Sequence, residues 1–196
     1  NCLYDGTTYG VYAFTTPAST NTYHYWYSID NGANWTQSQL LKYIGYEEYP
    51  VQLADGRLFC LQNTGSANYA YKIANLNGTN VYNGVSTVGG LGCTSAVNPT
   101  NGVTCVGLSF GIERYNSGSN TGTAILGPWA THYPTVPFYH AGQDLFYAAV
   151  QGNGSNSADL GMWVSDSGNP TTFTKLGALP RTNSAQTPYD CACFNW

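Results

Sequence analysis

The chain has 196 residues, of which 8% are charged and 15% are aromatic, and its formal net charge at pH 7 is −4. Six Lys and Arg residues are too few to neutralise a phosphate backbone, so the composition argues against a nucleic acid partner. No run of 18 apolar residues is present, and the sequence therefore predicts no membrane-spanning helix. The length favours a single domain over residues 1–196.

Two turn markers repeat along the chain. Turns of the Asp/Asn-x-Gly type fall at 30–32, 75–78, 116–118 and 166–168, and turn glycines fall at Gly6, Gly56, Gly102 and Gly142. Both series recur about every 45 residues, which is the length of a four-stranded propeller blade. The sequence therefore predicts approximate repeats over 1–48, 49–93, 94–132 and 133–182, followed by a closing tail at 183–196.

Glycine and proline also interrupt the chain at short intervals, which predicts short strands and no helix. The expected first strands are 49–52, 95–98 and 134–137, and the expected second strands are 8–15, 57–62, 103–109 and 144–151. The expected third strands are 23–28, 69–74, 111–115 and 161–165, and the fourth are 35–39, 80–85, 122–126 and 173–176. The predicted fold is an all-β propeller of four four-stranded blades, with a β-sandwich as the alternative.

The two ends of the chain are expected to close the propeller ring. Residues 1–6 resemble 52–56, and 186–190 look like an additional first strand. The termini are therefore predicted to share one blade, which would leave no open sheet edge. A first residue other than Met and glycosylation sequons at Asn34, Asn77 and Asn153 predict a secreted glycoprotein.

Six cysteines without zinc-site spacing predict disulfides in an oxidising compartment. The predicted disulfide residues are Cys2, Cys60, Cys93, Cys105, Cys191 and Cys193. Cys2 is expected to pair with Cys191 or Cys193 and so to lock the ring. Cys93 is expected to pair with Cys105 across a turn, which leaves Cys60 for the remaining tail cysteine. A Cys60–Cys105 disulfide is the alternative, because the repeat pattern predicts matching positions for these two cysteines in adjacent repeats.

The segment Ser28-Ile29-Asp30-Asn31-Gly32-Ala33-Asn34-Trp35 resembles an Asp-box, Ser-x-Asp-x-Gly-x-Thr-Trp, with Asn34 in place of Thr. The run 49–59 resembles the blade opening of sialidase-like repeats, and Asp166-Ser167-Gly168 keeps the Asp and Gly of the box. The resemblance implies a structural hairpin turn between the third and fourth strands of a blade. In that turn Asp30 and Asp166 would bind turn amides, Gly32 and Gly168 would allow the bend, and Trp35 would pack into its own blade.

Sialidase-like enzymes hold a carboxylate with three arginines, and this chain has Arg57, Arg114 and Arg181. Those enzymes are built on six blades, however, and we expect no sialidase activity from four. The three histidines have no metal-site spacing, and no cofactor motif is present, so no metal or cofactor is expected.

The loops that lead from one repeat to the next would gather at one end of a propeller axis. They carry the predicted ligand-binding residues, which are Tyr46, Glu47, Glu48, Tyr49, Trp129, His132, Tyr133 and Arg181. Tyr and Trp offer flat apolar surface, while Asn, Gln and Asp offer hydrogen bonds, and this composition suits sugars. The predicted function is a secreted, non-enzymatic, carbohydrate-binding protein whose partners are glycans or polysaccharides. A self-assembling structural subunit of an extracellular fibre, coat or appendage is the first alternative, and a small glycosidase using Glu47 or Glu48 is the second.

Overall fold

The computed structural model describes residues 2–15, 22–44, 50–62, 69–89, 94–126, 135–150 and 161–177. All regular structure in these ranges is β-strand. The first sheet contains β1 (Cys2–Tyr4), β2 (Tyr9–Thr15), β3 (Thr22–Ser28) and β4 (Thr36–Ile44). The second contains β5 (Val51–Gln52), β6 (Leu58–Gln62), β7 (Tyr69–Ala74) and β8 (Asn80–Ser86). The third contains β9 (Thr94–Asn98), β10 (Val103–Leu108), β11 (Gly111–Asn116) and β12 (Thr123–Leu126). The fourth contains β13 (Val136–His140), β14 (Leu145–Val150), β15 (Gly161–Ser165) and β16 (Phe173–Gly177).

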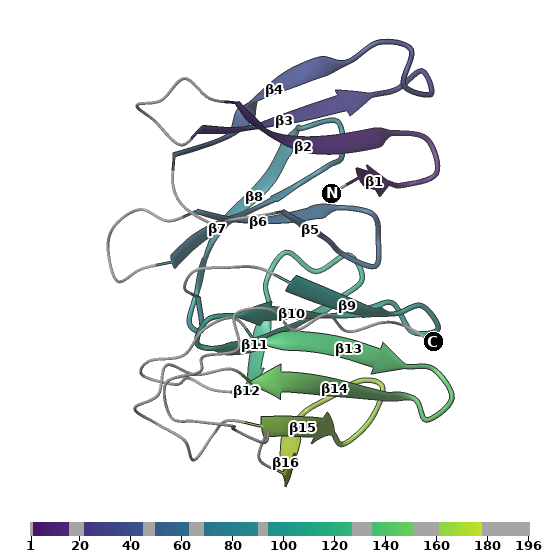
Figure 1. Cartoon of the computed structure of the whole chain (residues 1–196), viewed down its shortest axis with the longest axis vertical. Helices are drawn as coiled ribbons and strands as arrows, with labels where there is room; N and C mark the ends of the chain where they lie inside the picture. Colours follow the sequence, from purple (N-terminus) through teal and green to yellow (C-terminus); the bar gives the residue numbers. More distant parts are fainter. Residues whose placement is uncertain are drawn as a thin grey trace, which may run out of the picture.

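Each sheet is an antiparallel meander whose strands are paired in chain order. The described part of the chain therefore forms four separate four-stranded sheets, in place of the two large sheets of a β-sandwich. The sheets are stacked along the longest axis of the molecule, with the first sheet at one end and the fourth at the other (Figure 1). This arrangement is compatible with propeller blades, but it does not show a closed ring. The predicted closing tail, 183–196, lies outside the described residues.

Apolar side chains fill each of the three boundaries between neighbouring sheets. Side chains alternate between the two faces of a strand, so β6 serves two of these boundaries. Leu58 and Cys60 face the first sheet, where they pack with Tyr25 and Leu76, whereas Phe59 and Leu61 belong to the cluster shared with the third sheet. A third cluster joins the third and fourth sheets and consists of Ala96, Val103, Cys105, Ile112, Leu126, Phe146, Ala148, Val150 and Phe173. The core is therefore a series of layers between sheets.

A tyrosine of one sheet is bonded to the next sheet at two of these boundaries. The Tyr25 hydroxyl donates to the Leu76 carbonyl at 2.6 Å, and the Tyr71 hydroxyl donates to the Asn120 carbonyl at 3.1 Å. Each tyrosine ring lies against a glycine of its own sheet, Gly10 and Gly84 respectively, where a Cβ would overlap the ring or its hydroxyl. These tyrosines are 46 residues apart, in the third strands of consecutive sheets, and so mark the repeat.

The predicted disulfides of Cys105 are absent, because Cys105 is a buried free thiol. Cys60 faces the first sheet and Cys105 faces the fourth, so these residues lie on opposite faces of their respective sheets. Burial raises the pKa of the Cys60 thiol to about 12 and that of Cys105 further still, so both thiols remain protonated at neutral pH. The Cys2 side chain and Cys93, Cys191 and Cys193 lie outside the described residues.

Candidate functional site

The hairpin turns β1–β2 and β3–β4, and their counterparts in the other sheets, lie at one end of each sheet because successive strands are antiparallel (Figure 1). The turn between β3 and β4 is held by the carboxylate of Asp30. Its Oδ1 accepts the Asn34 backbone N–H at 2.8 Å, and its Oδ2 accepts the Asn34 side-chain amide at 2.7 Å. Gly32 has a φ of 84° and donates its N–H to the Ser28 hydroxyl at 2.9 Å. Hydrogen bonds from the side chain and backbone of Asn34, and from Ser28, lower the pKa of Asp30 to about 2.

The turn between β15 and β16 repeats this arrangement although its sequence is degenerate. Asp166 accepts the Thr171 backbone N–H at 2.9 Å through Oδ1 and the Thr171 hydroxyl through Oδ2. The Thr171 side chain is the main cause of a pKa for Asp166 below the ordinary value. The carbonyl of Gly168 accepts the side-chain amides of Asn98 and Asn101 at 3.0 and 2.9 Å, so this turn also joins the third and fourth sheets.

Trp35 lies differently from the sequence-based expectation. Its side chain is 40% exposed, and its indole N–H donates to the Gly32 carbonyl at 3.0 Å. The indole therefore covers its own turn and does not enter the core between sheets, because its polar group finds an acceptor within the turn.

The low pKa of Asp30 predicts a pH-dependent contribution to stability. A carboxyl whose pKa is lower in the folded protein stabilises the fold above its unfolded pKa, here 3.8, and this effect is lost as the pH falls through about 2. We expect the melting temperature of the wild-type protein to fall more steeply over this interval than that of Asp30→Asn. Thermal melts at several pH values measure the difference, since the other carboxyls are common to both proteins. Parallel curves would contradict the assignment.

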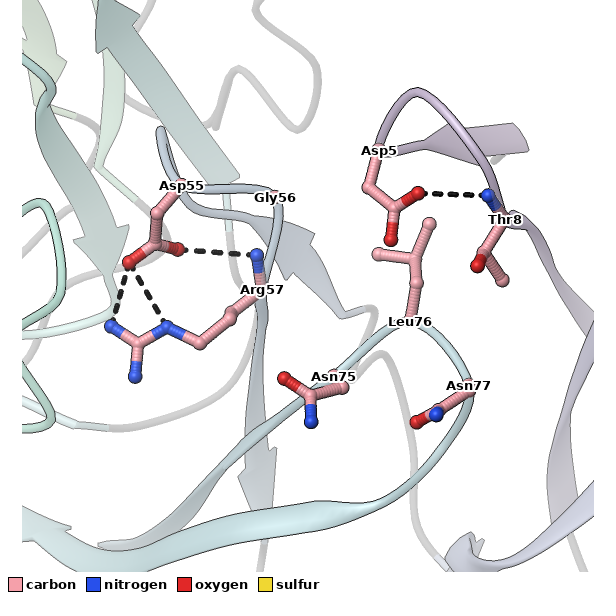
Figure 2. Close-up of a pocket in the computed structure, with 8 residues that line it drawn as sticks. All are labelled: Asp5, Thr8, Asp55, Gly56, Arg57, Asn75, Leu76 and Asn77. Atoms are coloured by element: carbon pink, nitrogen blue, oxygen red, sulfur yellow. Dashed lines mark hydrogen bonds and ion pairs between the residues drawn. The ribbon is translucent and has the colours of Figure 1, made fainter.

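A polar pocket lies at this turn end, between the first and second sheets (Figure 2). It has a volume of about 250 Å³ and is lined by Asp5, Thr8, Asp55, Gly56, Arg57, Asn75, Leu76 and Asn77. Asp5 and Thr8 come from the β1–β2 turn, Asp55 to Arg57 from the β5–β6 turn, and Asn75 to Asn77 from the β7–β8 turn. The pocket exists because turns of two adjacent sheets meet there.

On one side of this pocket, the Asp55 and Arg57 side chains are bonded to each other and to residues of the third sheet. Arg57 donates to the Asp55 carboxylate from Nη2 at 2.7 Å and from Nε at 2.9 Å, and the Gly118 N–H adds a bond at 2.7 Å. Burial alone would raise the pKa of Asp55, but the hydrogen bonds from Arg57 and Gly118 outweigh it and hold that pKa below its ordinary value. This carboxylate and guanidinium thus neutralise one another and join the second sheet to the third.

The other side of the pocket carries polar atoms that have no hydrogen-bond partner among the described residues. Asp5 Oδ1 accepts the backbone N–H groups of Thr7 and Thr8 at 3.0 and 2.8 Å, whereas Oδ2 has no hydrogen-bond partner among the described residues. The turn amides outweigh partial burial and lower the pKa of Asp5, so its carboxylate is ionised at neutral pH. The side-chain amide of Asn75 and the Nδ2 of Asn77 are also without partners in the described ranges. The pocket therefore offers one acceptor of full charge and two amides to a ligand.

The predicted ligand-binding residues cannot be compared with this pocket. Tyr46, Glu47, Glu48, Tyr49, Trp129, His132, Tyr133 and Arg181 all lie outside the described residues, as does Asn153. Nothing in the sequence singles out Asp5 as a binding residue, and the pocket was not predicted. The only sequence signal for these residues is that Asp5 lies in the β1–β2 turn and Asn75 in the β7–β8 turn. The sequence does not show that these two turns lie side by side.

The described arginines do not converge as the sialidase comparison would require. Arg57 is paired with Asp55, and Arg114 donates from Nη1 to the Pro170 carbonyl at 2.8 Å, at a different boundary between sheets. Among the described residues no group of three or more His, Cys, Asp and Glu side chains is arranged to hold a metal ion. The same part of the chain contains no helix that is long and apolar enough to span a membrane.

Two predicted glycosylation sequons lie in described turns. The Asn34 side-chain nitrogen donates to Asp30, so the atom that would carry a glycan is already engaged in a bond that holds the turn. Asn77 is exposed, and its carbonyl oxygen accepts the Thr79 hydroxyl at 2.8 Å.

No protein-family model matches this chain, and no curated protein is significantly similar to it.

Proposed function

We propose that the protein binds carbohydrate, without catalysis, in the pocket between its first and second sheets. One observation carries the proposal: Asp5 Oδ2, the side-chain amide of Asn75 and the Nδ2 of Asn77, from turns of two sheets, line one pocket and have no partner among the described residues. A carboxylate accepts bonds from two neighbouring hydroxyls, and an amide both donates and accepts, so together they match the donor and acceptor pattern of a sugar.

The size and charge of the pocket also favour a small neutral ligand. Its volume of about 250 Å³ is slightly below the roughly 300–1,000 Å³ typical of sites for larger organic ligands, which suits a single sugar residue. Because Arg57 and Asp55 neutralise one another, Asp5 is left as the unbalanced charge. The site therefore disfavours anionic sugars.

We further propose that the four sheets are blades of the Asp-box type, stacked as in an arc of a propeller, and that the protein acts outside the cell. The equivalent carboxylate bonds of Asp30 and Asp166, each at a turn between the third and fourth strands, support the blade type. The sequons and the low charge of the chain support an extracellular protein.

The sugar-binding proposal predicts that Asp5→Asn weakens sugar binding by about 10-fold to 100-fold, because a hydrogen bond to a charged group contributes roughly 1.5–3 kcal/mol. The asparagine can still accept the turn amides through its carbonyl oxygen. Isothermal titration with neutral monosaccharides and with polysaccharides, chosen by a glycan array, measures the affinity. Asn75→Ala is expected to weaken binding as well.

Asn116→Ala is the matched control, because Asn116 is an exposed asparagine at the corresponding turn of the third sheet, outside the pocket. It should bind like the wild-type protein. A blank array, or equal affinity for the wild type, Asp5→Asn and Asn75→Ala, would rule out this site.

A further inference from the structure

The outer face of the first sheet carries aromatic and aliphatic side chains. Tyr25 points toward the second sheet, so its neighbour Trp26 points away from it. Val11 is paired with Trp26 across β2 and β3, and Tyr4 is stacked on Tyr9 at 4.5 Å on the same face. Tyr4 is 49% exposed and the other three are partly exposed. The four residues Tyr4, Tyr9, Val11 and Trp26 are called the leading face.

The outer face of the fourth sheet has similar chemistry. Phe146 and Ala148 pack against the third sheet, so Tyr147 between them points away from it. Tyr147 is stacked on Phe138 of β13 at 5.2 Å with an angle of 11° between the rings, and Val164 of β15 is its partner on the other side. All three side chains are partly exposed. The three residues Phe138, Tyr147 and Val164 are called the trailing face.

Neither set contains a charged residue. In stacked repeat structures the terminal repeats normally present a polar outer face, and exposed apolar patches mark interaction sites. Aromatic residues without charges are also typical of the centres of protein interfaces. The two faces are therefore better suited to contact with another protein surface than to exposure to water.

The internal boundaries indicate what each face fits. At each boundary, the face of one sheet that points toward the next sheet in the chain packs against the face of that next sheet that points back. The trailing face of the fourth sheet would continue this series on the leading face of a first sheet. These two faces lie at opposite ends of the molecule (Figure 1), so a second copy of the chain has to supply the partner.

We propose that the fourth sheet of one copy docks head to tail on the first sheet of a second copy, with Tyr147 and Phe138 against Trp26 and Val11. Such a contact is heterologous, so it joins copies into a ring or an open array. It extends the layered packing seen within the chain, and it does not depend on sugar binding at the pocket.

The test is the mass in solution of the intact protein, measured by light scattering after size exclusion and by sedimentation at rising concentration up to about 100 µM. We expect a mass of two or more copies. Trp26→Asp and Tyr147→Asp should each weaken association about 100-fold or more, because each places an unpaired charge at the centre of the contact. Val85→Asp is the control, since Val85 is 62% exposed on β8 of the second sheet, and it should associate like the wild type.

Mixing the two variants tests the head-to-tail geometry. The Trp26→Asp chain keeps an intact trailing face and the Tyr147→Asp chain an intact leading face, so the mixture should form a heterodimer that neither variant forms alone. Hydrogen exchange of the wild type should show concentration-dependent protection in β2, β3, β14 and β15, a readout that does not require folded variants. A single-copy mass at all concentrations, or association that the mixture fails to restore, would overturn the proposal.

Discussion

Replacing Glu113 with alanine is expected to lower the free energy of unfolding by about 2–4 kcal/mol, because each buried donor left without an acceptor costs roughly 1–3 kcal/mol. Glu113 is 4% exposed in β11 of the third sheet. Its Oε1 accepts the Ser86 hydroxyl at 2.8 Å and the Thr87 N–H at 3.3 Å, and its Oε2 accepts the Tyr115 hydroxyl at 2.7 Å. Alanine would leave the buried Ser86 and Tyr115 hydroxyls without this acceptor.

Chemical denaturation followed by tryptophan fluorescence measures this loss. Glu113→Gln is the matched control, because it keeps the side-chain length and one acceptor oxygen and should cost less than the alanine variant. A loss below about 1 kcal/mol for Glu113→Ala would mean that the three bonds contribute little to the fold.

The Glu113 bonds also show how the boundaries between sheets differ. Ser86 ends β8 of the second sheet and Thr87 follows it, so the Glu113 side chain joins two sheets, as the Tyr71 hydroxyl does by reaching Asn120. The Tyr115 hydroxyl, in contrast, is used within the third sheet to hold Glu113. The sequence repeat therefore specifies a common sheet, and individual residues specify how each sheet contacts the next.

The strand positions could be predicted from sequence because turn chemistry is local. Gly56 and Gly102 have φ values of 85° and 71°, which favour glycine, and such residues mark where strands begin. Each sheet accordingly lies within one predicted repeat. The strand pattern follows from residues that act within a few positions of one another.

Contacts between sheets were not predictable in the same way. When the repeats are aligned on Gly56 and Gly102, Cys60 corresponds to Val106 and not to Cys105, a shift of one residue. In a strand, one residue moves a side chain to the opposite face, so the predicted Cys60–Cys105 pair was wrong. The pocket at Asp5 was missed for a related reason, because it depends on the spacing of two sheets.

The tightest approach between sheets leads to the second large prediction, that Gly107→Ala lowers the free energy of unfolding by about 3 kcal/mol or more. A Cβ on Gly107 in β10 would overlap the Thr135 carbonyl oxygen and would lie 2.5 Å from Pro137 Cδ and 2.8 Å from Thr94 Oγ1. The opposing backbone is itself held in place, since the Thr94 hydroxyl donates to the Thr135 carbonyl at 2.9 Å and the Thr135 N–H donates to Leu108 at 3.2 Å.

The added methyl can be accommodated only if the third and fourth sheets separate, which would break these bonds and open the apolar layer around Phe146. Gly177→Ala is the matched control, because nothing lies within 4 Å of the position of its Cβ, and its effect should stay within about 0.5 kcal/mol. Denaturant unfolding of both variants decides the matter. Equal stability of the two would mean that the third and fourth sheets are not packed as closely as the Gly107 contact requires.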